Sequence, residues 1–216
     1  MITPDEYRAF VANLFFRNGD LSKDFAHAAM GIHEELQEGR HATSDGNAIE
    51  EAGDLLFFGT AAEFVLQEHL ASLGDTAIDE QPYGLLHCLE LTKGDAPVVG
   101  GVIQGSLDLT LLNSGEPTVY WTPAAELLVR AKKWVGYGAA PSIQQARELI
   151  VHTIAATWGG VHIMLSPRNH ELDTMFQTAA RANMAKLGQR YKEGFSLTSA
   201  EDRDLAAEAA AIAQAS

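Results

Sequence analysis

Apolar residues recur along most of this chain with the period of an α-helix. Phe25, Ala29, Ile32 and Leu36 fall three or four residues apart, which places them on one face of a helix. Similar patterns predict helices over residues 4–17, 20–39, 47–70, 122–135, 142–165 and 172–188. We therefore predict an all-α fold, a helical bundle whose apolar faces share one core.

Residues at the predicted helix ends support these boundaries. Asn18-Gly19 is typical of a helix end, and Ser142 is a favourable N-cap. Thr122-Pro123 predicts a helix start with Pro123 at the first helical position, where its missing N–H is not needed. The tail, residues 199–216, is rich in Ala and Glu and is predicted to be either a terminal helix or partly disordered.

The middle of the chain lacks a clear period. Residues 74–97 contain several turn-forming residues and predict a connection, with room for one short helix around 85–91. Residues 98–112 fit either a glycine-containing helix or a pair of strands, and we favour the helix because nothing else in the chain resembles a sheet. We predict a single domain over residues 1–216, with a core of 1–72 and 120–204 and an insertion at about 74–119.

Composition limits the partners of the protein. The 216 residues carry a formal net charge of −14, so nucleic acid and anionic membranes would be repelled. Cys88 is the single cysteine, which excludes an internal disulfide and a thiolate zinc site. The first residues lack the apolar core of a signal peptide, and no apolar run approaches the ~18 residues that span a bilayer. We therefore expect a cytoplasmic protein with no membrane partner.

Two acidic strings lie within the helical pattern, at residues 34–38 and 50–54. On a helix, Glu35 and Glu38 share one face, and so do Glu51 and Asp54. If the two helices pack antiparallel, these carboxylates form one acidic pocket. Crowded carboxylates cannot all stay ionised without a large pKa penalty, which hard divalent cations relieve by taking oxygen ligands. The spacing alone also fits two solvated helix faces in an acidic protein.

Other metal and nucleotide motifs fit poorly. A zinc protease helix needs H-E-x-x-H, but Gln37 stands where the second His belongs after His33-Glu34. A ferritin-like di-iron site needs E-x-x-H on two helices, and only Glu38 to His41 matches. Residues 100–106 have the outer glycines of a P-loop without its Lys.

The acidic strings carry a family resemblance. Residues 25–38 (FAHAAMGIHEELQE) and 49–57 (IEEAGDLLF) contain E-E-x-x-E followed, after a spacer, by E-x-x-D. This pattern resembles the all-α nucleoside triphosphate pyrophosphohydrolases of the MazG-like group, in which it usually lies within E-E-L-G-D-(L/V)-L. Ala52 stands where Leu is usual.

A second segment strengthens the resemblance. Residues 183–196 (NMAKLGQRYKEGFS) are similar to the closing N-x-x-K-L-x-x-R-Y-P-x-G-F-S of bacterial and phage members, with Lys192 where Pro is usual. Residues 130–138 (RAKKWVGYG) resemble, more weakly, a K-x-x-x-Y-G stretch of longer phage-type members. The match covers residues 20–70 and 172–204, and nothing is recognised between about 74 and 117.

The resemblance implies a fold, a cofactor and a reaction. It implies a MazG-like bundle whose acidic helix pair holds Mg²⁺ or Mn²⁺, and hydrolysis of a nucleoside triphosphate to the monophosphate and pyrophosphate. The implied metal ligands are Glu35, Glu38, Glu51 and Asp54. Glu34 would orient and deprotonate the attacking water, so that Glu34, Glu35 and Glu38 are the expected catalytic residues.

The same resemblance implies substrate contacts from the C-terminal part. Asn183, Lys186 and Arg190 fall three or four residues apart, so one helix face can present all three to a ligand. By resemblance they contact phosphate or sugar, with Tyr191 nearby and Lys133 as a weaker candidate. Surface ion pairs of the two cations with Glu193 or Asp202 are the structural alternative.

Base recognition is expected where the first predicted helix ends, at Asn18, with Phe15 and Phe16 either there or in the core. A deoxynucleotide, with dGTP first, is the expected substrate; a dUTPase-like or dCTPase-like specialist, a broad triphosphatase and a guanosine alarmone hydrolase are alternatives. From another functional class, the alternative is a non-catalytic, metal-dependent nucleotide binder or an oligomeric interaction module. Because family members usually assemble, we expect a homodimer or homotetramer.

Overall fold

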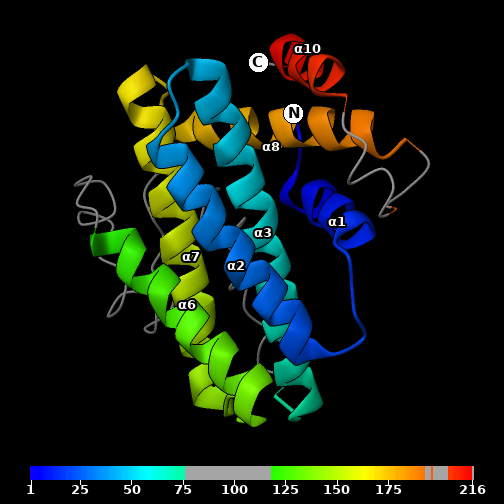
Figure 1. Cartoon of the computed structure of the whole chain (residues 1–216), viewed down its shortest axis with the longest axis vertical. Coiled ribbons are helices and arrows are strands. Elements are labelled where there is room, and N and C mark those ends of the chain that lie inside the picture. Colours follow the sequence, from blue (N-terminus) through cyan, green and yellow to red (C-terminus); the bar gives the residue numbers. More distant parts are fainter. Residues whose placement is uncertain (76–117, 193–195, 197–203, 216) are drawn as a thin grey trace.

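The computed structural model describes residues 1–75, 118–192, 196 and 204–215, and regular secondary structure in these ranges is entirely helical (Figure 1). The elements are α1 (Pro4–Leu14), α2 (Leu21–Arg40), α3 (Asp45–Ser72), α6 (Thr118–Tyr137), α7 (Ile143–Leu165), the 3₁₀ turn η2 (Ser166–Arg168), α8 (Leu172–Arg190) and α10 (Leu205–Ala215). The prediction of an all-α fold is therefore confirmed for the described part of the chain. The predicted helices at 85–91 and 98–112 lie outside the described residues.

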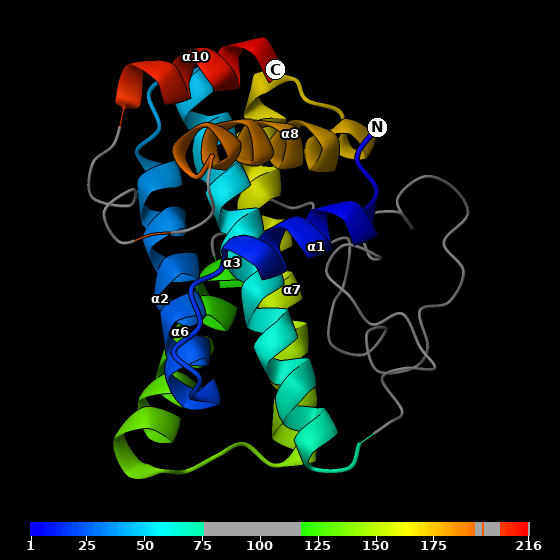
Figure 2. The same cartoon turned by 90° about the vertical axis from the view of Figure 1, so that its right-hand side faces the viewer.

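Four long helices form the body of the molecule. α2 packs against α3 and α6, and α7 packs against α3 and α6, so the four close into a bundle (Figure 1). α8 crosses one end of this bundle against α3, α10 lies over α8, and α1 crosses α3 (Figure 2). In the predicted tail, residues 199–216, α10 confirms a terminal helix over Leu205–Ala215. Residues 197–203 and 216 lie outside the described ranges.

The helix pair α2 and α3 follows directly from local sequence. Asp20 caps α2 by accepting the backbone N–H of Ser22, and Ser44 caps α3 by accepting that of Asn47. The connection between the helices is so short that they run antiparallel as neighbours. Phe25, Ile32 and Leu36 of the predicted seam are buried, each contributing roughly 1.5–3 kcal/mol if fully transferred from water, and the smaller Ala29 is buried with them.

A glycine sets how closely α8 approaches α3. A Cβ atom on Gly53 would lie 2.8 Å from the backbone oxygen of Ala179 and 3.0 Å from the Cβ of Asn183. A backbone oxygen cannot move as a side chain can, so only glycine allows this contact. Because Gly53 precedes Asp54, the close approach brings α8 to the acidic face of α3.

The predicted start of α6 is wrong. Pro123 lies inside α6, which begins at Thr118, rather than at the first helical position. The added turn packs Tyr120, which is buried, against Gly159, and places Trp121 in edge contact with His33 at 5.6 Å between ring centroids. This packing offsets the backbone hydrogen bond that an interior proline removes.

The expectation that no apolar run is long enough for a membrane span is also wrong. Residues Ile143–Arg168 form a helical stretch of 26 residues that meets the length and composition of a span. However, 78% of its apolar window is buried inside the structure. The core helix of a bundle passes the same test, so this one helix is weak evidence for a membrane span.

Candidate active site

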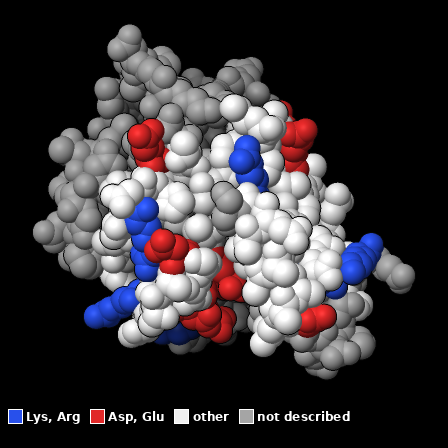
Figure 3. All heavy atoms as spheres, turned by 90° about the horizontal axis from the view of Figure 1, so that it is seen from above, with Lys and Arg blue, Asp and Glu red and all other residues white. Residues whose placement is uncertain are grey.

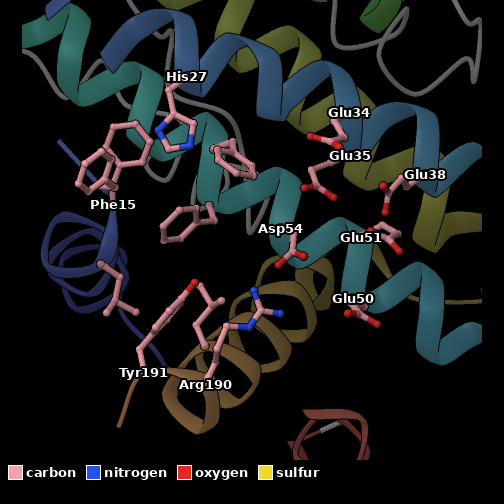
Figure 4. Close-up of a pocket in the computed structure, with 15 residues that line it drawn as sticks. Phe15, His27, Glu34, Glu35, Glu38, Glu50, Glu51, Asp54, Arg190 and Tyr191 are labelled. Atoms are coloured by element: carbon pink, nitrogen blue, oxygen red, sulfur yellow. The ribbon is translucent and has the colours of Figure 1, made fainter. Parts of the chain in front are cut away.

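A pocket of about 470 Å³ opens between α2, α3 and the end of α8 (Figure 4). Carboxylates form one part of its wall and aromatic rings form another. Its lining residues are Leu14, Phe15, Phe16, His27, Glu34, Glu35, Glu38, Glu50, Glu51, Asp54, Phe57, Phe58, Leu187, Arg190 and Tyr191. This volume lies in the range of small-molecule sites, so the pocket can hold a ligand of nucleotide size.

Three carboxylates meet across the α2–α3 contact. Glu35 and Glu38 lie one turn apart on α2, Glu51 faces them from α3, and one oxygen of each lies within 4.8 Å of the others. Figure 4 shows these side chains turned toward a common space, with Glu34 beside Glu35. The predicted acidic pocket is thus present in the fold, with oxygen atoms spaced closely enough for one cation.

Burial and mutual repulsion change the pKa values in this cluster. Burial, then the charges of Asp54 and Glu51, raise the pKa of Glu35 to about 10. The pKa of Glu51 is raised to about 7, mainly by burial, although a hydrogen bond from Glu35 opposes the rise. In the metal-free protein, Glu35 therefore keeps a proton at neutral pH and shares it with Glu51.

Asp54 differs from these three because protein groups already occupy both of its oxygens. Asn183 on α8 donates from Nδ2 to Oδ1 of Asp54 at 2.8 Å, and Lys186 donates from Nζ to Oδ2. Lys186 also donates to Glu50 at 3.2 Å and is 2% exposed. Burial lowers the pKa of Lys186, but Asp54 and Glu50 outweigh this effect and raise it. The ammonium group therefore stays charged between two carboxylates.

Further hydrogen bonds fix the side chains around the cluster. Tyr7 on α1 donates its hydroxyl to Oδ1 of Asn183 at 3.0 Å, and this orients the amide so that Nδ2 faces Asp54. Asn47, one turn before Glu51, donates from Nδ2 to Oε1 of Glu51 at 2.7 Å. Both amides reduce the freedom of the carboxylates that they contact.

Arg190 reaches the pocket from the last turn of α8. Its Nε and Nη2 donate to the two oxygens of Glu208 on α10, at 2.8 and 2.6 Å. Its guanidinium carbon lies 5.8 Å from the ring centre of Tyr191, which also lines the pocket. The alternative partners Glu193 and Asp202 lie outside the described residues, and the partner seen is a buried residue of α10.

An aromatic group forms the other part of the wall. His27 stacks on Phe15 at 4.9 Å between ring centroids and meets Phe58 edge-on at 5.7 Å. Phe57 contacts both Phe15 and Phe58. These flat apolar surfaces suit a planar ring system, and His27 adds one polar edge.

Most of the predicted site residues are brought together. Glu34, Glu35, Glu38, Glu51, Asp54, Arg190 and Tyr191 line the pocket, and Asn183 and Lys186 lie directly behind Asp54. The remaining two are elsewhere. Lys133 is exposed on α6, and the backbone N–H of Asn18 donates to Asp24 at 2.6 Å, which fixes the exit of α1. Neither is among the described lining residues.

Sequence reasoning missed His27, Phe57, Phe58 and Glu208. Helical spacing carried a signal for the first three. His27 lies two turns before Glu34 and Glu35, and Phe57 and Phe58 lie one turn after Asp54, so they continue the acidic faces of α2 and α3. Glu208 gave no such signal because its contact with Arg190 joins two separate helices.

The outer surface at this end of the bundle is largely uncharged. Figure 3 looks down on the end where α8 and α10 lie, and its coloured part shows small separate groups of acidic and basic side chains. Acidic and basic side chains are thus mixed with uncharged ones on the described part of this face.

No protein-family model matches the chain, and no curated protein or solved structure matches it either.

Proposed function

We propose that this pocket binds a nucleoside triphosphate with Mg²⁺ or Mn²⁺ and hydrolyses it to the nucleoside monophosphate and pyrophosphate. The observation that carries the proposal is one pocket whose wall combines a carboxylate cluster, an arginine and an aromatic group. A nucleotide has matching parts: a polyanion that needs cations and a planar base that needs stacking surfaces.

The carboxylates fit a divalent cation. Glu35, Glu38 and Glu51 supply three oxygens within 4.8 Å, the oxygen-rich donor set that Mg²⁺ and Mn²⁺ prefer. Their repulsion, which raises the pKa of Glu35 and Glu51, is the unfavourable energy that such a cation removes. When bound, the cation neutralises phosphate oxygens and lowers the pKa of an attacking water.

Two cationic side chains near the pocket have different roles: Lys186 supports the acidic wall, and Arg190 contacts the ligand. Lys186 is buried behind Asp54 and neutralises part of the acidic wall. Arg190 lines the cavity and offers a planar fork that matches phosphate oxygens. Six carboxylates outnumber this one lining cation among the described residues, so a triphosphate enters only when divalent cations accompany it.

Glu34 suits proton transfer from the attacking water. It lines the pocket beside Glu35 and stays outside the cluster of three that would hold the cation (Figure 4). An exposed carboxylate within reach of the reacting phosphorus can accept the proton of the water as the new P–O bond forms. At the other end of the pocket, Phe15 and His27 would stack on the base.

The test is a panel assay with each ribo- and deoxynucleoside triphosphate, with Mg²⁺, Mn²⁺ or chelator. Monophosphate and pyrophosphate are separated by chromatography. We expect metal-dependent release of pyrophosphate, lost in Glu35→Gln and retained in the matched control Glu148→Gln, an exposed residue of α7. The non-catalytic alternative is supported instead if wild-type protein binds a nucleotide with metal but turns over none.

A further inference from the structure

We infer that the C-terminal helix α10 belongs to the phosphate-binding machinery, because Glu208 holds the guanidinium of Arg190 in the orientation that faces the pocket. Glu208 is thereby a positioning residue that acts through Arg190. The inference rests on the proposed function for the identity of the ligand and on the described contacts for the geometry.

Burial of the Glu208 carboxylate costs desolvation free energy, which a purely structural contact need not incur. Between residues 205 and 215 it is the single charged residue, and the others are Leu, Ala, Ile and Gln. Its side chain is 3% exposed in the contact with Arg190, so its carboxylate has left water. Burying an ion pair rarely stabilises a fold more than apolar packing of the same volume would. An alanine-rich helix could dock on α8 through residues such as Ile212 alone.

The contact fixes one edge of the guanidinium. Nε and Nη2 of Arg190 donate in parallel to the two oxygens of Glu208, at 2.8 and 2.6 Å. This bidentate geometry sets both the position and the plane of the group. The second edge, formed by Nη1 and Nη2, is not used by Glu208, and its N–H groups match phosphate oxygens. Tyr191, which also lines the pocket, hydrogen-bonds the guanidinium as well and helps to hold it there.

Arg190 is placed to use that second edge. It lines the pocket together with Asp54 and Tyr191, and Figure 4 shows its guanidinium extending from α8 toward Asp54. A free arginine side chain would lose rotamer freedom on binding a phosphate, and the pair with Glu208 removes that loss beforehand. The expected consequence is tighter binding of the triphosphate, with no change in which bond is cleaved.

The experiment measures binding of tripolyphosphate with Mg²⁺ by calorimetry, together with the Nε–Hε resonance of Arg190 in ¹⁵N spectra. Arg190→Lys assigns the resonance by its disappearance. We expect Glu208→Gln to weaken tripolyphosphate binding about tenfold, the loss of one oriented charge-assisted hydrogen bond. Glu208→Asp should retain part of the affinity. In any active preparation KM should rise more than kcat falls.

The Hε resonance of Arg190 shows whether Glu208 orients the guanidinium or only helps α10 to pack on α8. We expect a slowly exchanging Hε in wild-type protein, a shift on adding tripolyphosphate, and loss of protection in Glu208→Gln. Ile212→Val, which trims α10 packing and leaves Glu208 in place, is the matched control. Equal loss of affinity in Glu208→Gln and Ile212→Val at equal stability would overturn the inference, as would unchanged affinity in Glu208→Gln.

The outcomes also distinguish this inference from the proposed reaction. If wild-type protein binds tripolyphosphate with the Hε shift but hydrolyses no nucleotide, the inference stands and the proposed reaction is wrong. If nucleotide turnover is present and Glu208→Gln leaves its KM unchanged, the proposed reaction stands and the inference is wrong. Wild-type protein that binds no tripolyphosphate with Mg²⁺ overturns the inference, and the nucleotide panel then decides the reaction by itself.

Discussion

Lys186 on α8 donates a hydrogen bond to Asp54 on α3, and this contact places a buried ammonium group beside the carboxylate cluster. The bond joins two helices that are far apart in the sequence and links the stability of the fold to the charge of the pocket. Because Lys186 also contacts Glu50, its removal would leave two carboxylates without their cation.

Lys186→Met tests this link. The substitution keeps the length of the side chain but removes its charge, so we expect a loss of about 2–4 kcal/mol in the free energy of unfolding, measured with urea. Lys133→Met, on the exposed face of α6, should change stability by less than ~0.5 kcal/mol. Adding Asp54→Asn to Lys186→Met should recover part of the loss. A Lys186→Met protein as stable as wild type would contradict the role of the ion pair.

The pH dependence of stability follows from the raised pKa values of Glu35 and Glu51. Because burial and repulsion raise both values in the folded state, these two groups hold more protons in the folded protein than in the unfolded chain above about pH 4.5. This contribution is present at low pH and is lost as pH rises through about 7 for Glu51, and toward 10 for Glu35. Burial lowers the pKa values of His152 and His162, which opposes this effect in part. In chelator, we expect about 1–3 kcal/mol less stability at pH 8.5 than at pH 5.5.

Thermal unfolding at a series of pH values measures this slope. Glu35→Gln mimics the protonated acid, so its unfolding temperature in chelator should depend less on pH and should exceed that of wild type at pH 8.5. Addition of Mn²⁺ should flatten the wild-type profile as well, because a cation at the cluster replaces the proton. A wild-type profile that rises with pH between 5.5 and 8.5 in chelator would show that the cluster is not the dominant group.

The fold was largely predictable because its signals are local. Helix α2 could be placed from its apolar period, and the structure confirms the antiparallel packing of α2 with α3 on which the acidic pocket depended. The start of α6 could not be predicted in this way. It depends on the packing of buried Tyr120 against α7, which is a tertiary contact. The same limit applies to Glu208, whose partner Arg190 lies 18 residues away on another helix.

The candidate site was predictable to the same extent. Spacing and resemblance identified the acids that line the pocket and predicted Glu35, Glu38, Glu51 and Asp54 as one set of metal ligands. In the structure, Asn183 and Lys186 bind both oxygens of Asp54, so the cluster of three is Glu35, Glu38 and Glu51. Lys186 pairs with Asp54 because of the way α8 crosses α3. Helical spacing within α2 or α3 cannot predict this contact between helices.

Metal titration separates the roles of these acids. We expect Glu35→Gln, Glu38→Gln and Glu51→Gln each to weaken Mn²⁺ binding about tenfold or more, since each removes one of three grouped oxygens. Asp54→Asn should reduce the affinity less and the stability more, because Asp54 pairs with Lys186. Isothermal titration with Mn²⁺ measures the affinity, and urea unfolding measures the stability. An Asp54→Asn protein that loses Mn²⁺ binding completely would make Asp54 a direct ligand.

The aromatic part of the pocket predicts a separate effect on nucleotide binding. Phe58→Leu or His27→Ala removes part of the flat surface around Phe15, so we expect nucleoside triphosphate binding to weaken about tenfold. Binding of tripolyphosphate, which has no base, should stay unchanged. The control is Phe64→Leu, because the ring of Phe64 on α3 packs under the guanidinium of Arg8 on α1 and does not line the pocket. Equal losses for nucleotide and tripolyphosphate would show that these rings do not contact a base.

Two glycines of α3 give a final prediction with opposite signs. A Cβ on Gly53 would lie 2.8 Å from the backbone oxygen of Ala179, so Gly53→Ala must push α8 away from α3 and stretch the contacts of Asp54 with Asn183. We expect Gly53→Ala to lose about 1–3 kcal/mol of stability and to weaken Mn²⁺ binding. Nothing lies within 4 Å of a Cβ at Gly46, so Gly46→Ala should gain up to about 1 kcal/mol from helix propensity alone.

Urea unfolding of both variants, with and without Mn²⁺, measures these differences. Both substitutions are Gly→Ala in one helix, Gly53 in its interior and Gly46 in its first turn. Helix propensity alone would favour Ala at least as much at Gly53, so a loss of stability in Gly53→Ala reports the approach of α8. A Gly53→Ala protein that is stabilised as much as Gly46→Ala would mean that α8 does not press on α3 at this point. The positions of Lys186 and Asn183 beside Asp54 would then need another cause, because their placement depends on that approach.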